Sequence, residues 1–130
     1  MPKFIMLVRA TAEGESGRPP NQAELDEMGV YNDSLRAAGI LESAQGFVAS
    51  SKGARLTYSA SGKPEDVKVT PGPFPLDSMV SGYWVITVKD LDEAIGWAKN
   101  VPFRGGGVEI RKIADECDFQ EWKDAANVPA

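Results

Sequence analysis

Histidine is absent from the 130 residues of the chain, and cysteine occurs once, as Cys117. Without histidine the protein lacks the commonest general base near neutral pH and the commonest metal ligand. A single cysteine excludes an intrachain disulfide and a cysteine-rich zinc site. Because no dinucleotide-binding or metal-ligand spacing occurs either, we expect no cofactor and no metal.

Basic residues are few and scattered, with 14 lysines and arginines against 19 aspartates and glutamates and a formal charge of −5. Nucleic acids and anionic membranes are bound by concentrated basic surfaces, so we expect neither as a partner. No apolar run approaches the length of a membrane span, and the first residues lack the pattern of a signal peptide. These features favour a cytoplasmic protein.

Hydrophobic periodicity divides the chain into short, alternating elements. The apolar run 3–9 has the length of a central strand, whereas the Gly- and Pro-containing stretch 10–20 is expected to be a loop. The inner face of the second helix is expected to carry Leu91, Ala94, Ile95 and Ala98. The predicted order is strand, helix, strand, hairpin, strand, helix, strand and terminal helix, over 3–9, 21–38, 40–49, 54–59 with 66–70, 82–88, 90–100, 108–113 and 118–126.

This order is the β-α-β-β-α-β pattern of an α+β, ferredoxin-like domain with an inserted hairpin. The length suits one domain, which we expect over 1–115, followed by a tail or short helix over 116–130. In such a fold two helices cover one face of the sheet and leave the other face apolar and uncovered. We therefore expect a homodimer in which two sheets pack face to face.

Several separated motifs resemble one known family. They are Pro71-Gly72-Pro73-Phe74, Gly82-Tyr83-Trp84-Val85-Ile86, Asp90-Leu91-Asp92-Glu93-Ala94-Ile95, Glu27-Met28-Gly29-Val30-Tyr31-Asn32 and Ser50-Ser51-Lys52-Gly53-Ala54-Arg55. Together they resemble the YCII-related, or DGPF-domain, family of small dimeric α+β barrel proteins. The resemblance implies a small-molecule ligand and, as in a few members, a cofactor-free enzyme acting on a small aromatic or carbonyl compound.

Departures from the family pattern remove charge from the expected site. The family loop Asp-Gly-Pro-Phe-Ala-Glu-Thr-Lys-Glu here reads Pro-Gly-Pro-Phe-Pro-Leu-Asp-Ser-Met over 71–79, so three carboxylates and a lysine are missing. The family's Gly-Glu-Gly-Leu segment appears as Ala-Gln-Gly-Phe, with the amide Gln45 in place of a carboxylate. The His-Asp pair of the shorter members cannot exist here. We expect a more apolar cleft and chemistry that differs from the family's usual chemistry.

Four residues are candidates for catalysis. Arg9, at the end of the first strand, could hold a carboxylate or enolate, or could form a structural ion pair with a nearby glutamate, Glu24, Glu27 or Glu42. Tyr31 could stabilise an oxyanion, although a tyrosine at helical spacing is more often a core residue. Asp77 or Glu109 could move a proton, or could be solvated or paired at the surface.

Five further residues are candidates for substrate binding. Phe74 and Trp84 could clamp a planar ligand, or could belong to the core. Glu109 and Arg111 share a strand face and, with Trp84 across the sheet, could form a pocket wall or instead a cross-strand pair at a dimer interface. The remaining two candidates are polar side chains: Asn32, which matches a family motif, and Gln45, the amide that replaces the family's carboxylate.

Three functions remain open from the sequence. The first is a cofactor-free lyase, isomerase or dehydratase; the second is a non-catalytic ligand-binding or accessory protein that has lost the acidic site residues of the family. The third is docking of a partner through the C-terminal segment 118–130. Nothing in the sequence identifies a substrate.

Overall fold

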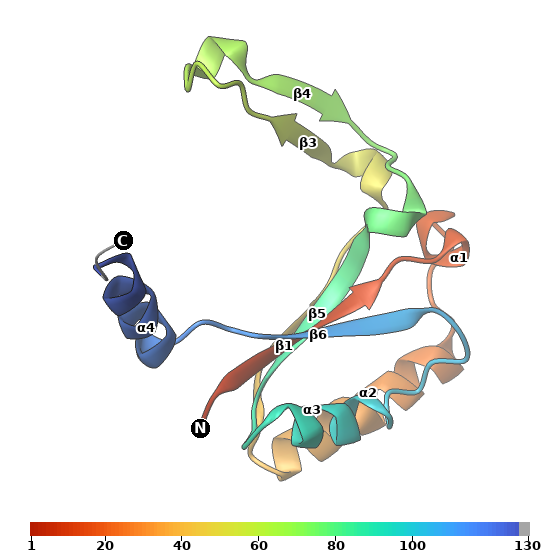
Figure 1. Ribbon diagram of the computed structural model, residues 1–130. Helices are drawn as coiled ribbons and strands as arrows, with labels where there is room; N and C mark the ends of the chain where they lie inside the picture. The colour runs from red at the N-terminus through yellow and green to blue at the C-terminus, as the bar shows by residue number, and fades with distance from the viewer. Residues whose placement is uncertain (128–130) are drawn as a thin grey trace.

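The computed structural model describes residues 1–127, and they form a four-stranded antiparallel sheet in the order β2-β5-β1-β6. Helices α2 (Gln22–Ala37) and α3 (Leu91–Ala98) lie together on one side of this sheet (Figure 1). The predicted α+β class, the ferredoxin-like order and the central position of the first strand are confirmed. The strands are β1 (Lys3–Arg9), β2 (Leu41–Gly46), β5 (Val80–Thr87) and β6 (Gly107–Lys112).

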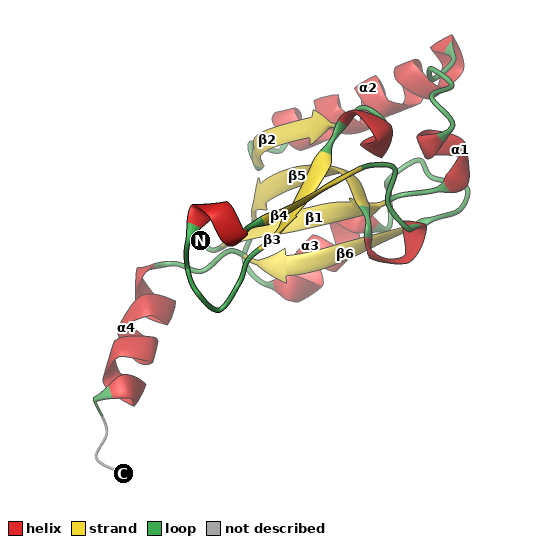
Figure 2. Cartoon of the chain, turned by 90° about the horizontal axis from the view of Figure 1, so that it is seen from above, coloured by secondary structure: helices red, strands yellow, loops and turns green. Residues whose placement is uncertain are grey.

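Two segments extend away from this sheet. Strands β3 (Ala54–Thr57) and β4 (Lys68–Pro71) pair only with each other and form the predicted inserted hairpin. Helix α4 (Glu116–Ala126) leaves from the end of β6 and points away from the sheet and its helices (Figure 2). The last residues of the predicted tail, 128–130, lie outside the described residues, and the predicted domain boundary at 115 stays a prediction.

The helix boundaries follow from the capping residues found in the sequence. Asn21 accepts a hydrogen bond from the backbone N–H of Glu24 at 2.8 Å, which satisfies one free donor at the start of α2. Gly39 ends this helix with a φ of 73°, a conformation that favours glycine. In the same way Asp90 accepts from the N–H of Glu93 at 2.9 Å and begins α3.

The segment 10–20 is not entirely a loop, and this part of the prediction is wrong. Helix α1 (Ala12–Glu15) forms a single turn within it, capped by the side chain of Thr11, which accepts from the N–H of Gly14 at 3.1 Å. This turn has no apolar periodicity that could have predicted it, because its cap begins it and it buries no residue.

The core lies between the sheet and the two helices. Alternation along β1 and β5 buries Phe4 and Met6 beside Trp84 and Ile86 against the helices, and Val88, directly after β5, is buried with them. The predicted inner face of α3 is partly wrong. Leu91 and Ile95 are exposed, while Ala94 is buried and Trp97 and Ala98 pack against the core. No helix within residues 1–127 is long and apolar enough to cross a lipid bilayer.

Candidate functional site

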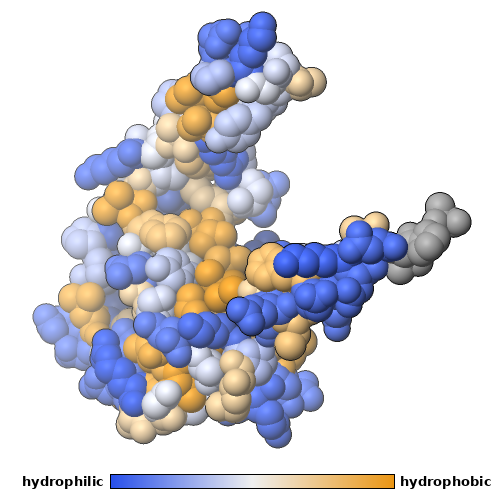
Figure 3. Space-filling view, turned by 90° about the vertical axis from the view of Figure 1, so that its left-hand side faces the viewer, coloured by the Kyte–Doolittle hydropathy of each residue, from blue (hydrophilic) through white to orange (hydrophobic). Residues whose placement is uncertain are grey.

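The sheet face turned away from α2 and α3, called the open face below, carries a stripe of apolar side chains at its centre. Strand alternation and the β1–β5 register place Ile5 and Leu7 opposite Val85 and Tyr83 on this face. All four side chains are only half-buried in the single chain. Figure 3 shows apolar side chains gathered in the hollowed region between the hairpin and α4.

A hollow of about 220 Å³ opens on this face at the end of β1. The turn before β5 forms one side of it, and β1 and β6 form the other. Its lining combines apolar and charged side chains, namely Leu7, Arg9, Asp77, Ser78, Met79, Val80 and Glu109. Three of the four candidate catalytic residues, Arg9, Asp77 and Glu109, therefore meet in one place.

The backbone aims Arg9 into this hollow. Pairing of β1 with β5 shifts between Val8 and Arg9, so that Arg9 lies opposite Val80 and Ser81 is left as an extra residue. Such bulges redirect side chains and occur often beside functional sites. On the other side Arg9 pairs with Gly107, and a Cβ atom there would lie 3.3 Å from Cδ of Arg9. The glycine thus leaves room for the arginine side chain.

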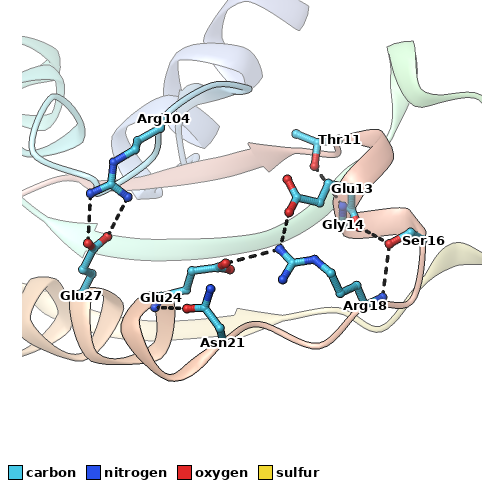
Figure 4. Close-up of polar contacts among 9 residues, drawn as sticks. All are labelled: Thr11, Glu13, Gly14, Ser16, Arg18, Asn21, Glu24, Glu27 and Arg104. Carbon is cyan, nitrogen blue, oxygen red and sulfur yellow. Dashed lines mark hydrogen bonds and ion pairs between the residues drawn. The ribbon is translucent and has the colours of Figure 1, made fainter.

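The guanidinium of Arg9 has no hydrogen-bond or ion-pair partner within residues 1–127. The three glutamates considered as its structural partners are engaged elsewhere: Glu24 with Arg18 at 3.3 Å, Glu27 with Arg104 at 3.0 Å and Glu42 with Lys3 at 3.8 Å. Figure 4 shows the first two pairs, with Arg18 also bound to Glu13. Arg9 is therefore available to an external anion.

The two carboxylates of the hollow differ in their contacts. Asp77 lies on the 3-10 turn Leu76–Ser78, is exposed, and has no bonded partner among the described residues. Glu109 of β6 accepts from Arg111 at 3.5 Å on the same strand face. The predicted sharing of a face by Glu109 and Arg111 is confirmed. Gln45, exposed and opposite Tyr83, lies on the far edge of the open face and does not line the hollow.

The structure separates Tyr31, Asn32 and Trp84 from this hollow. Trp84 pairs in register with Met6, whose side chain faces the helices, so the expected pocket wall of Trp84 with Glu109 and Arg111 is wrong. The indole N–H of Trp84 instead donates to Oδ1 of Asn32 at 2.8 Å.

Tyr31 is buried in the core, and its hydroxyl donates to the backbone carbonyl of Trp97 at 2.9 Å. Burial raises the pKa of Tyr31 to about 12, because the charged phenolate would lose its hydration. These contacts connect α2 to the end of α3 and make Tyr31 a structural residue. Its predicted role on a substrate oxygen does not fit this position.

The expected clamp of Phe74 and Trp84 is also wrong. Phe74 lies outside the core, with the guanidinium carbon of Arg55 4.3 Å from its ring centroid. Its backbone N–H donates to the hydroxyl of Ser50 at 3.1 Å, and Ser50 in turn donates to the carboxylate of Glu15. No sequence signal could have found this three-part network, because its members are 35 and 24 residues apart.

Within residues 1–127 no three Cys, Asp or Glu side chains are grouped so that they could hold a metal ion. A second hollow, between α3 and the start of β6, has only Lys99 as a charged lining residue. The charged side chains that line the first hollow are Arg9, Asp77 and Glu109.

Comparison with known proteins supports the resemblance seen in the sequence. No curated protein matches the chain. The model of the YCII-related domain family, however, matches residues 3–122, which span all four strands of the main sheet, the hairpin and both covering helices. The chain therefore belongs to the YCII-related domain family.

Proposed function

We propose that the protein is a homodimeric, small-molecule-binding enzyme that needs no cofactor and performs lyase or isomerase chemistry on a small aromatic or carbonyl anion. The observation that carries this proposal is the unpaired guanidinium of Arg9 at a hollow flanked by Asp77 and Glu109. A guanidinium makes two parallel hydrogen bonds to a carboxylate or enolate, which fixes the position of the ligand. The lone cysteine makes the cytoplasm its proposed location.

The uncovered apolar stripe supports the proposed homodimer. A four-stranded sheet with helices on one side leaves Leu7, Tyr83 and Val85 in contact with water, and a second sheet placed over them would remove this apolar surface from solvent. The same packing would close the hollow around Arg9 and exclude water. Polar interactions inside a closed site are stronger because the local dielectric constant is lower.

The proposed chemistry uses only groups of the chain. Asp77 or Glu109 takes a proton from a carbon next to the substrate carbonyl, and the C–H electron pair forms an enolate whose oxygen Arg9 stabilises. In a conjugated enolate, return of the proton to the carbon at the far end of the conjugated system completes an isomerisation. In an elimination, the enolate electron pair forms a new C=C bond, and the leaving group on the adjacent carbon departs with the electron pair of its own bond. Both reactions balance without an oxidant, a reductant or a metal.

Ligand binding by Arg9 is tested by titrating phenylpyruvate, an aromatic 2-oxo acid, into the protein and measuring its Kd by NMR. We expect Arg9→Gln to weaken binding by about 10- to 100-fold, the contribution of a charged hydrogen bond. Arg9→Lys should retain part of the affinity, and Arg36→Gln, on the exposed side of α2, should retain all of it. Equal affinities in all four proteins would refute the proposed anion site.

A non-catalytic binding protein is the second candidate, and it is favoured by the exposure of Asp77 and the engagement of Glu109 by Arg111. The two candidate functions predict different rates of proton transfer from the ligand. A catalyst should speed the exchange of the methylene protons of phenylpyruvate in D2O above the rate in buffer, and the double variant Asp77→Asn, Glu109→Gln should abolish this increase. Binding without faster exchange in the wild type would identify a binding protein.

A further inference from the structure

The hairpin β3–β4 and helix α4 leave the sheet at opposite ends. The hairpin leads into β5, whose first residue Val80 lies beside Arg9, whereas α4 follows β6, whose last residue Lys112 lies beside Phe4. Both segments extend on the side of the sheet that α2 and α3 do not cover (Figure 1). They therefore border the open face from its two ends.

Each of these segments carries apolar side chains that nothing in the single chain covers. On the hairpin Leu56 and Val69 are cross-strand neighbours and remain 49% and 60% exposed. On α4 Phe119 and Trp122 contact each other edge to face at 5.3 Å and remain 50% and 57% exposed. An isolated two-stranded hairpin and an isolated 11-residue helix are both marginally stable in water, so each needs a surface to pack on.

The two segments also have opposite charges. Residues 52–71 hold four basic and two acidic side chains, a net charge of +2. Helix α4 holds four acidic side chains and one basic side chain, a net charge of −3. Complementary charges beside complementary apolar pairs are typical of surfaces that bind each other and select their partner. The residues involved are Lys52, Arg55, Lys63, Lys68, Glu65 and Asp66 on the hairpin side, and Glu116, Asp118, Glu121, Asp124 and Lys123 on α4.

The hairpin and α4 start from opposite ends of the sheet, and in the single chain a gap over the open face separates them (Figures 1 and 3). A two-fold axis that runs across the strands reverses the strand direction in the second copy. The hairpin end of one sheet then lies over the α4 end of the other sheet. Such a dimer brings each hairpin beside the helix α4 of the other copy, twice by symmetry.

We propose that two copies of the chain exchange these segments, so that Phe119 and Trp122 of one copy pack on Leu56 and Val69 of the other. This inference rests on the homodimer of the proposed function and adds the relative orientation of its two copies. It also places α4 of the second copy at the hairpin end of the sheet, where the Arg9 hollow opens. Each site would then be completed by the C-terminal helix of the other copy.

The test is a complementation experiment. One variant carries Leu56→Ser and Val69→Ser, and the other carries Phe119→Ser and Trp122→Ser. In either homodimer both exchanged contacts have lost one partner surface. In a heterodimer of the two variants, one hairpin–α4 contact has both surfaces in their wild-type form. The other contact has both surfaces substituted. We therefore expect co-expression followed by native mass spectrometry to show clearly more heterodimer than the one-half given by random pairing.

Matched controls separate this result from general surface effects. Val30 and Leu91 are 71% and 48% exposed on the outer faces of α2 and α3, and a Val30→Ser, Leu91→Ser variant mixed with a wild-type chain of distinguishable mass should pair at random. The charge-reversal variants Lys68→Glu and Glu121→Lys repeat the test without removing apolar side chains. These charge-reversal variants replace the serine variants in the experiment if the serine variants do not fold.

The outcomes distinguish the two proposals. A wild-type dimer with random pairing in both variant sets would overturn the exchange of segments and leave the homodimer intact. A wild-type monomer at micromolar concentration would overturn the homodimer itself. Preferential heterodimers in both sets would support the exchange, because hairpin-to-hairpin packing gives no such preference in the serine set, and docking of α4 on its own chain gives none in either set.

Discussion

Gly72 is the residue at which the backbone leaves least room. A Cβ atom at this position would lie 1.8 Å from the carbonyl oxygen of Ser50, which belongs to the neighbouring backbone and cannot rotate away. We predict that Gly72→Ala lowers the free energy of unfolding by about 1–3 kcal/mol, the usual cost of inserting a methyl group into a packed site. Urea denaturation followed by circular dichroism measures this loss.

Gly29 supplies the matched control. It lies inside α2, and a Cβ atom there would meet nothing within 4 Å. Gly29→Ala should therefore raise the free energy of unfolding by about 0.5–1 kcal/mol, because alanine loses less backbone entropy in a helix. Equal shifts for the two substitutions would show that the contact with Ser50 does not constrain the loop.

Tyr31 gives the protein a pH dependence in the alkaline range. Its folded-state pKa of about 12 exceeds the ordinary value of 10.0, so the unfolded chain loses its phenol proton first. The contribution of Tyr31 to stability is complete below pH 10 and is lost as the pH rises toward 12. We predict that the difference in unfolding free energy between wild type and Tyr31→Phe shrinks across this range.

Urea titrations of both proteins at pH 9 and pH 11.5 provide the measurement for Tyr31. At pH 9 the wild type should be more stable by about 1 kcal/mol, the value of one buried hydrogen bond. A difference that stays constant between the two pH values would mean that the phenol of Tyr31 does not titrate differently in the folded and unfolded states.

At the scale of elements, helix α4 depends on its first turn. Asp115 accepts from the N–H of Asp118 at 3.1 Å, while Asp118 accepts from the N–H of Asp115 at 3.0 Å, a reciprocal capping box. The hydrogen bond from Lys112 holds the pKa of Asp118 below its ordinary value. The helix start is therefore fixed by short-range polar contacts.

We predict that Asp115→Ala destabilises α4 by about 1 kcal/mol and lowers its helix content, because the first turn loses its cap. Glu121→Ala is the control, since alanine has the better helix propensity at an exposed position in the middle of the helix. Carbonyl and Cα chemical shifts of 116–126, measured by NMR, report the helix content directly. An unchanged helix in Asp115→Ala would show that packing rather than capping holds α4.

The elements were predictable because each is specified by neighbouring residues. The run 3–9 gave β1 without error, and Asn21 and Gly39 gave the limits of α2 within one or two residues. The grouping of Arg9 with Asp77 and Glu109 was not specified in this way. It depends on the register of β1 with β6, which pairs Leu7 with Glu109. A sequence pattern that identifies a strand does not give its partner or its register.

The errors at the site have the same origin. Trp84 and Tyr83 are adjacent in β5, and a shift of one residue exchanges the core face for the open face. The sequence suggested Trp84 for the pocket, but the register assigns the open face to Tyr83. Tyr31 and Asn32 match a family motif and were therefore candidates for contact with a substrate. The sequence could not show that both bond within the chain, because their partners Trp97 and Trp84 are distant in the sequence.

At the scale of the whole molecule, the single chain leaves one side of its sheet uncovered. The helices cover one side of the sheet, while the open face, the hairpin and α4 all expose apolar residues on the other side. A face-to-face dimer would account for these three surfaces together. Its formation should therefore be sensitive to charge at the centre of the open face and insensitive to charge on the outer faces of α2 and α3.

We predict that Val85→Glu weakens dimerisation by at least about 100-fold, because a carboxylate would be buried between two sheets without a partner. The fold should survive, since Val85 is only half-buried in the single chain and lies on the face away from the core. Val30→Glu, on the exposed side of α2, is the control and should leave dimerisation unchanged. Sedimentation equilibrium should give a mass near 14.0 kDa for the Val85→Glu monomer and twice that mass for the control. A Val85→Glu protein that remains a dimer would place the subunit contact on another surface and leave the open face to a different partner.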